Sequence, residues 1–266
     1  MELGIKGKVV LVTGAGSGIG AAVARAFCKE QATTVFTDID ESGLKNAVKG
    51  LGSCSSYMVC DISQRARVKQ MFSEIGRLHG ALHVLVNCAA VNTASWVQDL
   101  KEEDIERVVA VNIKGYIYTT VEAIPMMKAS GFGRLIYINS TSGLKASAGL
   151  SLYSASKYFD RGFAISTALE AGEHNITSNS ICPSDIYPEG DIEAKSWRTP
   201  SLREVSILKE GVKSFEELIR KRKEKNPMKR SCTADDIAQL ALFLASERAG
   251  FINGQSIGVN GGSVPY

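Results

Sequence analysis

The chain has 266 residues, of which 44% are hydrophobic and 22% charged, and its formal net charge is +3. This composition is typical of a soluble globular protein and excludes collagen-like, disordered and disulfide-scaffold chains. Aromatic residues make up only 7% and the charge is only mildly basic, so no nucleic-acid partner is expected. At this length one large domain, residues 1–266, is favoured over two.

Short β-branched runs alternate with segments of helical spacing along the chain. Seven runs predict strands: Val9–Val12, Thr33–Thr37, Tyr57–Cys60, Leu82–Val86, Leu135–Ile138, Ile176–Ile181 and Ser256–Val259. The segments between them predict helices: Ile19–Lys29, Glu41–Lys49, Arg65–Gly76, Glu102–Ser130, Tyr153–Gly172 and Ala234–Ala245. Near-continuous apolar strands separated by helices indicate a parallel sheet covered on both faces. The right-handed crossover rule makes it a doubly wound α/β sheet.

Residues 184–226 break this alternation. The segment is polar, contains Pro188 and Pro200, and has helical character only over Ser214–Lys225. A long segment of this kind inside a compact domain is more often a functional lid than a linker, so a substrate lid is predicted at about 184–226. The basic run Arg220–Lys223 is interpreted as a solvated helix face.

The sequence contains no pattern typical of a membrane span, a disulfide framework or a metal site. No run approaches the roughly 18 apolar residues of a membrane span, and residues 1–8 lack the pattern of a secretory leader. The cysteines form no C-x-x-C pair and no zinc spacing, which predicts reduced thiols in a cytoplasmic protein; they are Cys28, Cys54, Cys60, Cys88, Cys182 and Cys232. The histidines His79, His83 and His174 have no matching ligand cluster, so no metal is expected.

A glycine-rich turn follows the first predicted strand and reads Thr13-Gly14-Ala15-Gly16-Ser17-Gly18-Ile19-Gly20. Glycines let the backbone approach a phosphate, and the N-terminus of the following helix attracts it. Asp38 closes the second strand 18 positions after Gly20, close to the spacing of a carboxylate that binds the adenosine ribose. A helix N-cap is a second, compatible role for it. Because a carboxylate there repels the 2′-phosphate of NADP, and neither Ser17 nor Ile39 supplies a positive charge, NAD is the expected cofactor.

Tyr153 and Lys157 are four positions apart, on one face of a predicted helix. A free phenol has a pKa of about 10, and a nearby cation lowers such a pKa by favouring the phenolate. The pair therefore predicts a general acid/base for an alcohol–ketone reaction. Taken alone, Y-x-x-x-K is a chance pattern in many helices, so the prediction depends on its context.

In order and spacing, these motifs together with Asn87, Asn112, Ser140, Cys182-Pro183 and Asn260-Gly261-Gly262 resemble the short-chain dehydrogenase/reductase family. The resemblance covers essentially the whole chain. It implies a single Rossmann-type domain with seven parallel strands, a nicotinamide cofactor, a small-molecule alcohol or ketone substrate and a homotetramer. It also implies the catalytic tetrad Asn112, Ser140, Tyr153 and Lys157. The cofactor contacts expected from motif and resemblance are Gly14, Gly16, Ser17, Gly18, Ile19, Gly20, Asp38, Ile39, Asp61, Ile62, Asn87, Ala89, Tyr153, Lys157 and Pro183.

The resemblance also implies a role for each member of the tetrad. Tyr153 exchanges a proton with the substrate oxygen, Ser140 hydrogen-bonds that oxygen, and Lys157 holds the nicotinamide ribose. Asn112 interrupts a helix and anchors a water that connects Lys157 to solvent. Thr141 and Ser142 are alternatives to Ser140, and Asp61 has a capping role at Ser63 as its alternative to an adenine contact.

Two departures from the family pattern concern residues that flank the cofactor. Ala90 and Ser184 stand where the family usually has glycine, and each adds a Cβ atom. Cys88 beside Ala89 is expected to be a packing residue rather than a nucleophile.

The substrate is less defined than the family. Three segments are similar to the sorbitol-6-phosphate 2-dehydrogenase group, which suggests a polyol, sugar or sugar phosphate. They are Ile138–Gly143, Asn226–Cys232 and Gly254–Ile257. Lys145, Lys195 and Arg198 either meet an anionic substrate group or are solvated. The functional alternatives are a catalytically idle NAD-binding regulator and an epimerase or dehydratase, although the latter are usually longer.

Overall fold

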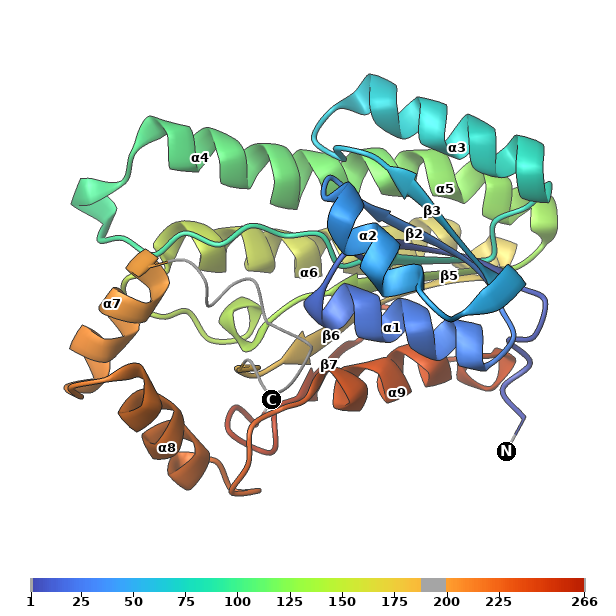
Figure 1. The fold of residues 1–266 in the computed structure, drawn as a ribbon. Coiled ribbons are helices and arrows are strands. Elements are labelled where there is room, and N and C mark those ends of the chain that lie inside the picture. The colour runs from blue at the N-terminus through green and yellow to red at the C-terminus, as the bar shows by residue number, and fades with distance from the viewer. Residues whose placement is uncertain (1, 188–199, 266) are drawn as a thin grey trace.

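The computed structural model describes residues 2–187 and 200–265, and a seven-stranded sheet forms its centre. Its strands are parallel and lie in the order β3-β2-β1-β4-β5-β6-β7 (Figure 1). The predicted doubly wound sheet is confirmed. The order in which successive strands are added reverses between β1 and β4, and such sheets bind ligands at the carboxyl ends of the strands at this position. The strands are β1 (Val9–Thr13), β2 (Thr33–Asp38), β3 (Ser55–Val59), β4 (Val84–Asn87), β5 (Gly133–Ile138), β6 (Ile176–Pro183) and β7 (Ser256–Val259).

Helices cover both faces of the sheet (Figure 1). On one face lie α1 (Gly18–Lys29) and α9 (Ala234–Ala245), with α2 (Glu41–Val48) beside α1. On the other lie α3 (Arg65–His79), α4 (Glu102–Val108), α5 (Tyr116–Ser130) and α6 (Ser151–Ala171). Among the described residues, no helix combines the length and the apolar character that a membrane crossing requires.

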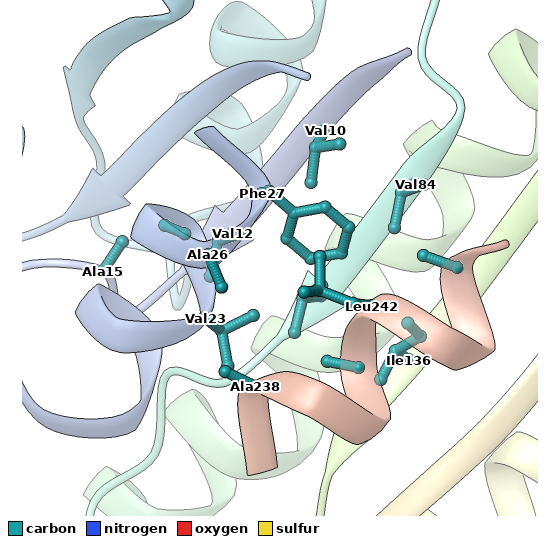
Figure 2. Packing of buried hydrophobic residues seen from close by; sticks show 14 of the residues in the cluster. Val10, Val12, Ala15, Val23, Ala26, Phe27, Val84, Ile136, Ala238 and Leu242 are labelled. Carbon is teal, nitrogen blue, oxygen red and sulfur yellow. The ribbon is translucent and has the colours of Figure 1, made fainter. Parts of the chain in front are cut away.

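Alternate residues of each central strand supply the two cores. Val10 and Val12 of β1 face α1 and α9, where Phe27 and Leu242 pack over them (Figure 2). Leu11, between the two valines, belongs to the core on the opposite face, as the two-residue period of a strand requires. Because both faces are buried, strands of this kind are apolar throughout, and this is why the sequence pattern identified them.

The predicted helix Glu102–Ser130 is continuous, with a π-helical segment between its two α-helical parts. Val109–Gly115 is π-helical and joins α4 to α5. Asn112 lies in that segment, fully buried, in keeping with the expectation that it interrupts a helix. Single π-helical turns of this type occur often at functional sites.

Two helices stand beside the carboxyl edge of the sheet, and the sequence analysis missed one of them. α8 (Phe215–Lys225) matches the predicted helical stretch Ser214–Lys225, whereas α7 (Pro200–Glu210) was not predicted as a helix. Its signals were a proline in the first turn and the apolar Leu202 and Val205. They pack in a small cluster with Tyr187 and Leu218. Lys195 and Arg198 lie outside the described residues.

Candidate active site

A cavity of about 1000 Å³ runs along the carboxyl ends of the strands, where the sheet order reverses. Most of the predicted site residues line it, although they come from the carboxyl ends of the strands β1 to β6 and from the helices α1 and α6. Of the predicted set, Gly16, Asn87 and Asn112 do not line it. Those that do are Gly14, Ser17, Gly18, Ile19, Gly20, Asp38, Ile39, Asp61, Ile62, Ala89, Ser140, Tyr153, Lys157 and Pro183.

The glycine loop between β1 and α1 is built for close approach. Gly14 has φ +68°, and a Cβ atom there would lie 2.7 Å from Ala89 Cα. Ser17, the N-cap of α1, makes no side-chain capping bond and therefore leaves the first N–H groups of the helix available to an anion. A pyrophosphate fits both the small residues and the positive end of the helix dipole.

Asp38 is held beside this loop at the end of β2. Its Oδ2 accepts a hydrogen bond from the Gly16 N–H at 3.0 Å, and its Oδ1 accepts one from the Asp40 N–H at 3.0 Å. Asp40, not Asp38, caps α2 by accepting from the Gly43 N–H. The alternative role of Asp38 as the helix N-cap is therefore wrong. A fixed carboxylate at this place fits the hydroxyls of an adenosine ribose.

Asp61 both lines the cavity and holds a turn. Its Oδ1 accepts from the Ser63 N–H at 3.0 Å and from Ser63 Oγ at 2.7 Å, and its Oδ2 accepts from Gln64 Nε2. Helix α3 begins at Arg65 with Gln64 as its N-cap, so Asp61 stabilises the turn that precedes the helix. This local role leaves the carboxylate at the cavity wall.

Asn87 lies behind the cavity and anchors the strand end. Its Oδ1 accepts from Thr119 Oγ1 at 2.8 Å, which ties β4 to α5. Thr13 was missed by the sequence analysis, but its Oγ1 accepts from the N–H groups of Cys88 at 3.0 Å and Ala89 at 3.1 Å. This hydroxyl fixes the loop against which Gly14 packs, and its position at the end of β1 was the available signal.

Asn112 connects the π-helical segment to two parts of the site. Its Oδ1 accepts from the Val91 N–H at 2.9 Å, and its Nδ2 donates to Val91 O at 2.9 Å and to Ser156 Oγ at 3.1 Å. Ser156 Oγ in turn donates to Tyr153 O at 2.8 Å. The side chain of Asn112 therefore positions the loop after β4 and the first turn of α6.

Ser140, Tyr153 and Lys157 face the same cavity. Ser140 follows β5, and its Oγ accepts from the Ser142 N–H at 3.0 Å, so its hydroxyl proton remains available to donate. Tyr153 lies half-buried in α6, and Lys157 Nζ is 5.9 Å from the centroid of its ring. Thr141 and Ser142 also line the cavity.

Lys157 has a partner that the sequence analysis missed. Its buried Nζ donates to Ile138 O at 3.0 Å and to Asp160 Oδ2 at 2.9 Å. Burial opposes the ammonium charge, but the attraction of Asp160, followed by that of Tyr116 and Tyr153, holds the pKa of Lys157 well above its usual value. The signal was an acidic residue three positions after Lys157 on the same buried helix face.

Cys88 is half-buried at the end of β4, and burial raises the pKa of its thiol to about 12. A thiol with that pKa stays protonated and is a poor nucleophile near neutrality. We expect Cys88→Ala to retain most of the activity. A loss of kcat/KM beyond about a hundredfold, roughly 2.7 kcal/mol, with NADH binding intact, would contradict the packing role.

Described residues of the segment predicted as a lid line part of the cavity, among them Asp185, Leu202 and Arg222. Arg222 of α8 pairs with Asp185 at 2.6 Å and Glu210 at 3.6 Å, so the interpretation of Arg220–Lys223 as a solvated face is wrong for Arg222. The exposed Lys145 and Lys209 lie at the rim of the cavity, and Lys209 Nζ donates to Ser147 Oγ at 2.8 Å.

Ala90 and Ser184, the two departures from glycine, line the cavity as well. No group of three potential metal ligands occurs among the described residues.

Comparison with known proteins places this geometry among oxidoreductases. Residues 8–199 match the family model for short chain dehydrogenase, and residues 200–263 match the one for enoyl-(acyl carrier protein) reductase. A D-beta-hydroxybutyrate dehydrogenase of Cupriavidus necator is 33% identical over 98% of this chain and 99% of its own. A galactitol 2-dehydrogenase of Agrobacterium fabrum is 30% identical over 97% of this chain and 98% of its own. A crystal structure of an actinorhodin polyketide ketoreductase with NADPH superposes with a TM-score of 0.90 at 28% identity, over 98% of each chain.

Proposed function

The chain belongs to the short-chain dehydrogenase family of oxidoreductases, and we propose that it transfers a hydride between NAD and a secondary alcohol or ketone. The observation that supports this most is that Tyr153, Lys157 and Ser140 share one cavity with the glycine loop and Asp38. When bound there, the nicotinamide supplies or accepts the hydride. A merely NAD-binding regulator has no need of a phenol, an ammonium and a hydroxyl at that point of the cavity.

Each of the three side chains has a defined task in this proposal. Tyr153 gives its proton to the substrate oxygen in ketone reduction and takes a proton from it in alcohol oxidation. Ser140 donates its hydroxyl hydrogen bond to the same oxygen and stabilises the charge that develops on it. Lys157 holds the nicotinamide ribose and, as a cation, favours the phenolate. Asn112 supports them through Val91 and Ser156.

For the substrate we propose a polyol, sugar or sugar phosphate. The galactitol 2-dehydrogenase among the relatives supports a polyhydroxylated molecule. Lys145 and Lys209 at the rim form no ion pair with an acidic side chain in the described part of the protein, and they suit an anionic group. In this proposal the chain acts as one domain whose segment 184–226 covers the substrate.

The experiment that tests the function is NADH formation with a panel of secondary alcohols. The panel contains polyols, sugar phosphates, 3-hydroxy acids, hydroxysteroids and small alcohols, so each class suggested by the relatives is present. Turnover with a polyol or its phosphate supports the proposal, and turnover only with another class replaces the substrate. NADH binding without turnover on any of them favours the idle regulator.

Cofactor choice is expected to follow Asp38. NAD should be preferred over NADP by at least about tenfold in kcat/KM, or roughly 1.4 kcal/mol, because the 2′-phosphate would meet a carboxylate. Asp38→Ala should relax this preference by removing the repulsion. Steady-state kinetics with both cofactors provide the measurement, and equal kcat/KM for the two in the wild-type protein would contradict NAD specificity.

A homotetramer is the proposed assembly. Apolar side chains remain exposed on the outer faces of α5 and α6 and after α9, namely Val121, Ile165, Leu169 and Phe251. Such exposed apolar groups suit the self-complementary contacts of a symmetric oligomer. Light scattering should give four times the mass of one chain, and a stable monomer at micromolar concentration would contradict this assembly.

A reducing compartment, the cytoplasm, is the proposed location. All six cysteines are free thiols, and burial raises the pKa of several of them, including Cys60 and Cys182, each to about 11. Unpaired cysteines in this number are typical of proteins that are kept reduced.

A further inference from the structure

Asp160 is a buried carboxylate to which none of the steps above gives a role. It lies on α6 three residues beyond Lys157 and is 0% exposed, and its Oδ1 has no hydrogen-bond partner among the described residues. Stability does not explain the Lys157–Asp160 pair, because removing two charges from water offsets most of their attraction and the unbonded oxygen adds a further cost. An explanation must therefore come from what Asp160 does to Lys157.

The pair directs the ammonium of Lys157. The two hydrogen bonds of Nζ within the described part of the chain go to Asp160 Oδ2 and Ile138 O, at 2.9 and 3.0 Å. Both acceptors belong to buried residues, one at the end of β5 and one on α6, whereas the Tyr153 ring centroid is 5.9 Å from Nζ. A carboxylate in contact with an ammonium cancels much of its field at a more distant group. Tyr153 therefore experiences an ion pair rather than a lone cation.

We propose that Asp160 is a positioning residue that fixes the Lys157 ammonium and weakens its effect on the hydroxyl proton of Tyr153. The proposal rests on the function proposed above. Tyr153 then keeps its proton to higher pH than it would beside an unpaired lysine. Because the neutral phenol is the proton donor for ketone reduction, Asp160 extends the pH range in which the site can protonate a substrate oxygen.

The other titratable groups around the pair keep one charge state near neutral pH. Burial raises the pKa of Tyr116 and Tyr137 far above the usual value of a phenol. It raises the pKa of Cys182 to about 11 and that of Cys88 to about 12. Arg161, the next residue on α6, stays charged and donates to Gly143 O and Ser256 Oγ. Lys157 and Asp160 are thus the charges whose balance the substitution of Asp160 changes.

The test is an ultraviolet titration of the cofactor-free protein that follows phenolate absorbance. The Tyr153 signal is the difference between each protein and the same protein carrying Tyr153→Phe. Asp160→Asn, which keeps the size and removes the charge, should lower the midpoint of this signal by about one pH unit, since neighbouring charges shift such groups by about 1–3 units. Glu170→Gln, which removes the same charge from the exposed side of α6, should leave it unmoved.

A second background separates action through Lys157 from direct action. In Lys157→Met, the further change Asp160→Asn should move the midpoint less than it does in the wild-type background, because only the direct field of the carboxylate is then removed. An equal shift in the two backgrounds would overturn the role of Asp160 in positioning Lys157. An unmoved or raised midpoint in folded Asp160→Asn would also overturn the proposal. Asp160→Leu replaces Asp160→Asn if the latter does not fold. The titration needs neither cofactor nor substrate, so its failure is distinct from the failure of NADH formation in the alcohol panel.

Discussion

Tyr153→Phe should lower kcat by about 10⁴-fold or more, at or beyond the top of the range for general acid/base catalysis and close to 5 kcal/mol in activation free energy. The substitution removes one hydroxyl and keeps the half-buried ring, so the packing of α6 should persist. NADH affinity should change little. Stopped-flow or steady-state kinetics on the best substrate of the panel, with NADH fluorescence as the binding control, measure the two effects separately.

The pH profile provides an independent check of the same residue. Alcohol oxidation needs Tyr153 as a proton acceptor, so its rate should rise with pH in the wild-type protein as the phenol loses its proton. The rise should be absent in Tyr153→Phe. Near-wild-type turnover in this variant would place the proton carrier elsewhere, and residues 184–226 would be the first segment to search.

Lys157→Ala should impair binding, turnover and stability together. It removes the proposed ribose contact and the cation beside Tyr153, and it leaves Asp160 buried without its partner. Breaking a buried ion pair in this way costs about 3–5 kcal/mol. Urea denaturation and NADH titration measure the losses. The matched control is Lys157→Met with Asp160→Leu, in which an apolar pair replaces the ionic one and should recover stability without recovering turnover.

The stability loss of Lys157→Ala should depend on pH in a defined direction. Burial raises the pKa of Asp160 to about 6 from an ordinary 3.8, even though Lys157 lowers it. Without Lys157 the folded protein holds this proton to still higher pH, whereas the unfolded chain releases it near 3.8. The folded state then binds more protons, so stability falls as pH rises. The variant should be closer to wild type at pH 5 than at pH 8, and the reverse order would contradict a buried, unpaired Asp160.

The sequence predicted the sheet and most of the cavity lining because these depend on local patterns. The central strands β1 and β4 are buried on both faces and apolar along most of their length, which made them visible in the sequence. The edge strands β3 and β7 are only partly buried, and short apolar runs between helical segments indicated them instead. The glycine turn, Asp38 and the Tyr153–Lys157 spacing each lie within one strand–turn–helix unit or one helix. The structure places Asp38, Tyr153, Lys157 and most of the glycine turn at the cavity. The helix α7 was missed because the polar segment that precedes it obscures where the helix begins.

The tertiary structure alone decided which groups hold the site in place. Thr13 fixes the loop at Ala89, 76 positions away, Asn112 reaches Ser156 on α6, and Arg222 pairs with Asp185. No spacing rule joins such residues, because each pair meets only after separate elements have packed. Asp160 lies three residues from Lys157, but its significance comes from burial. In water the two charges would be solvated independently, and between α6 and the sheet each is left with the other as its main counter-charge.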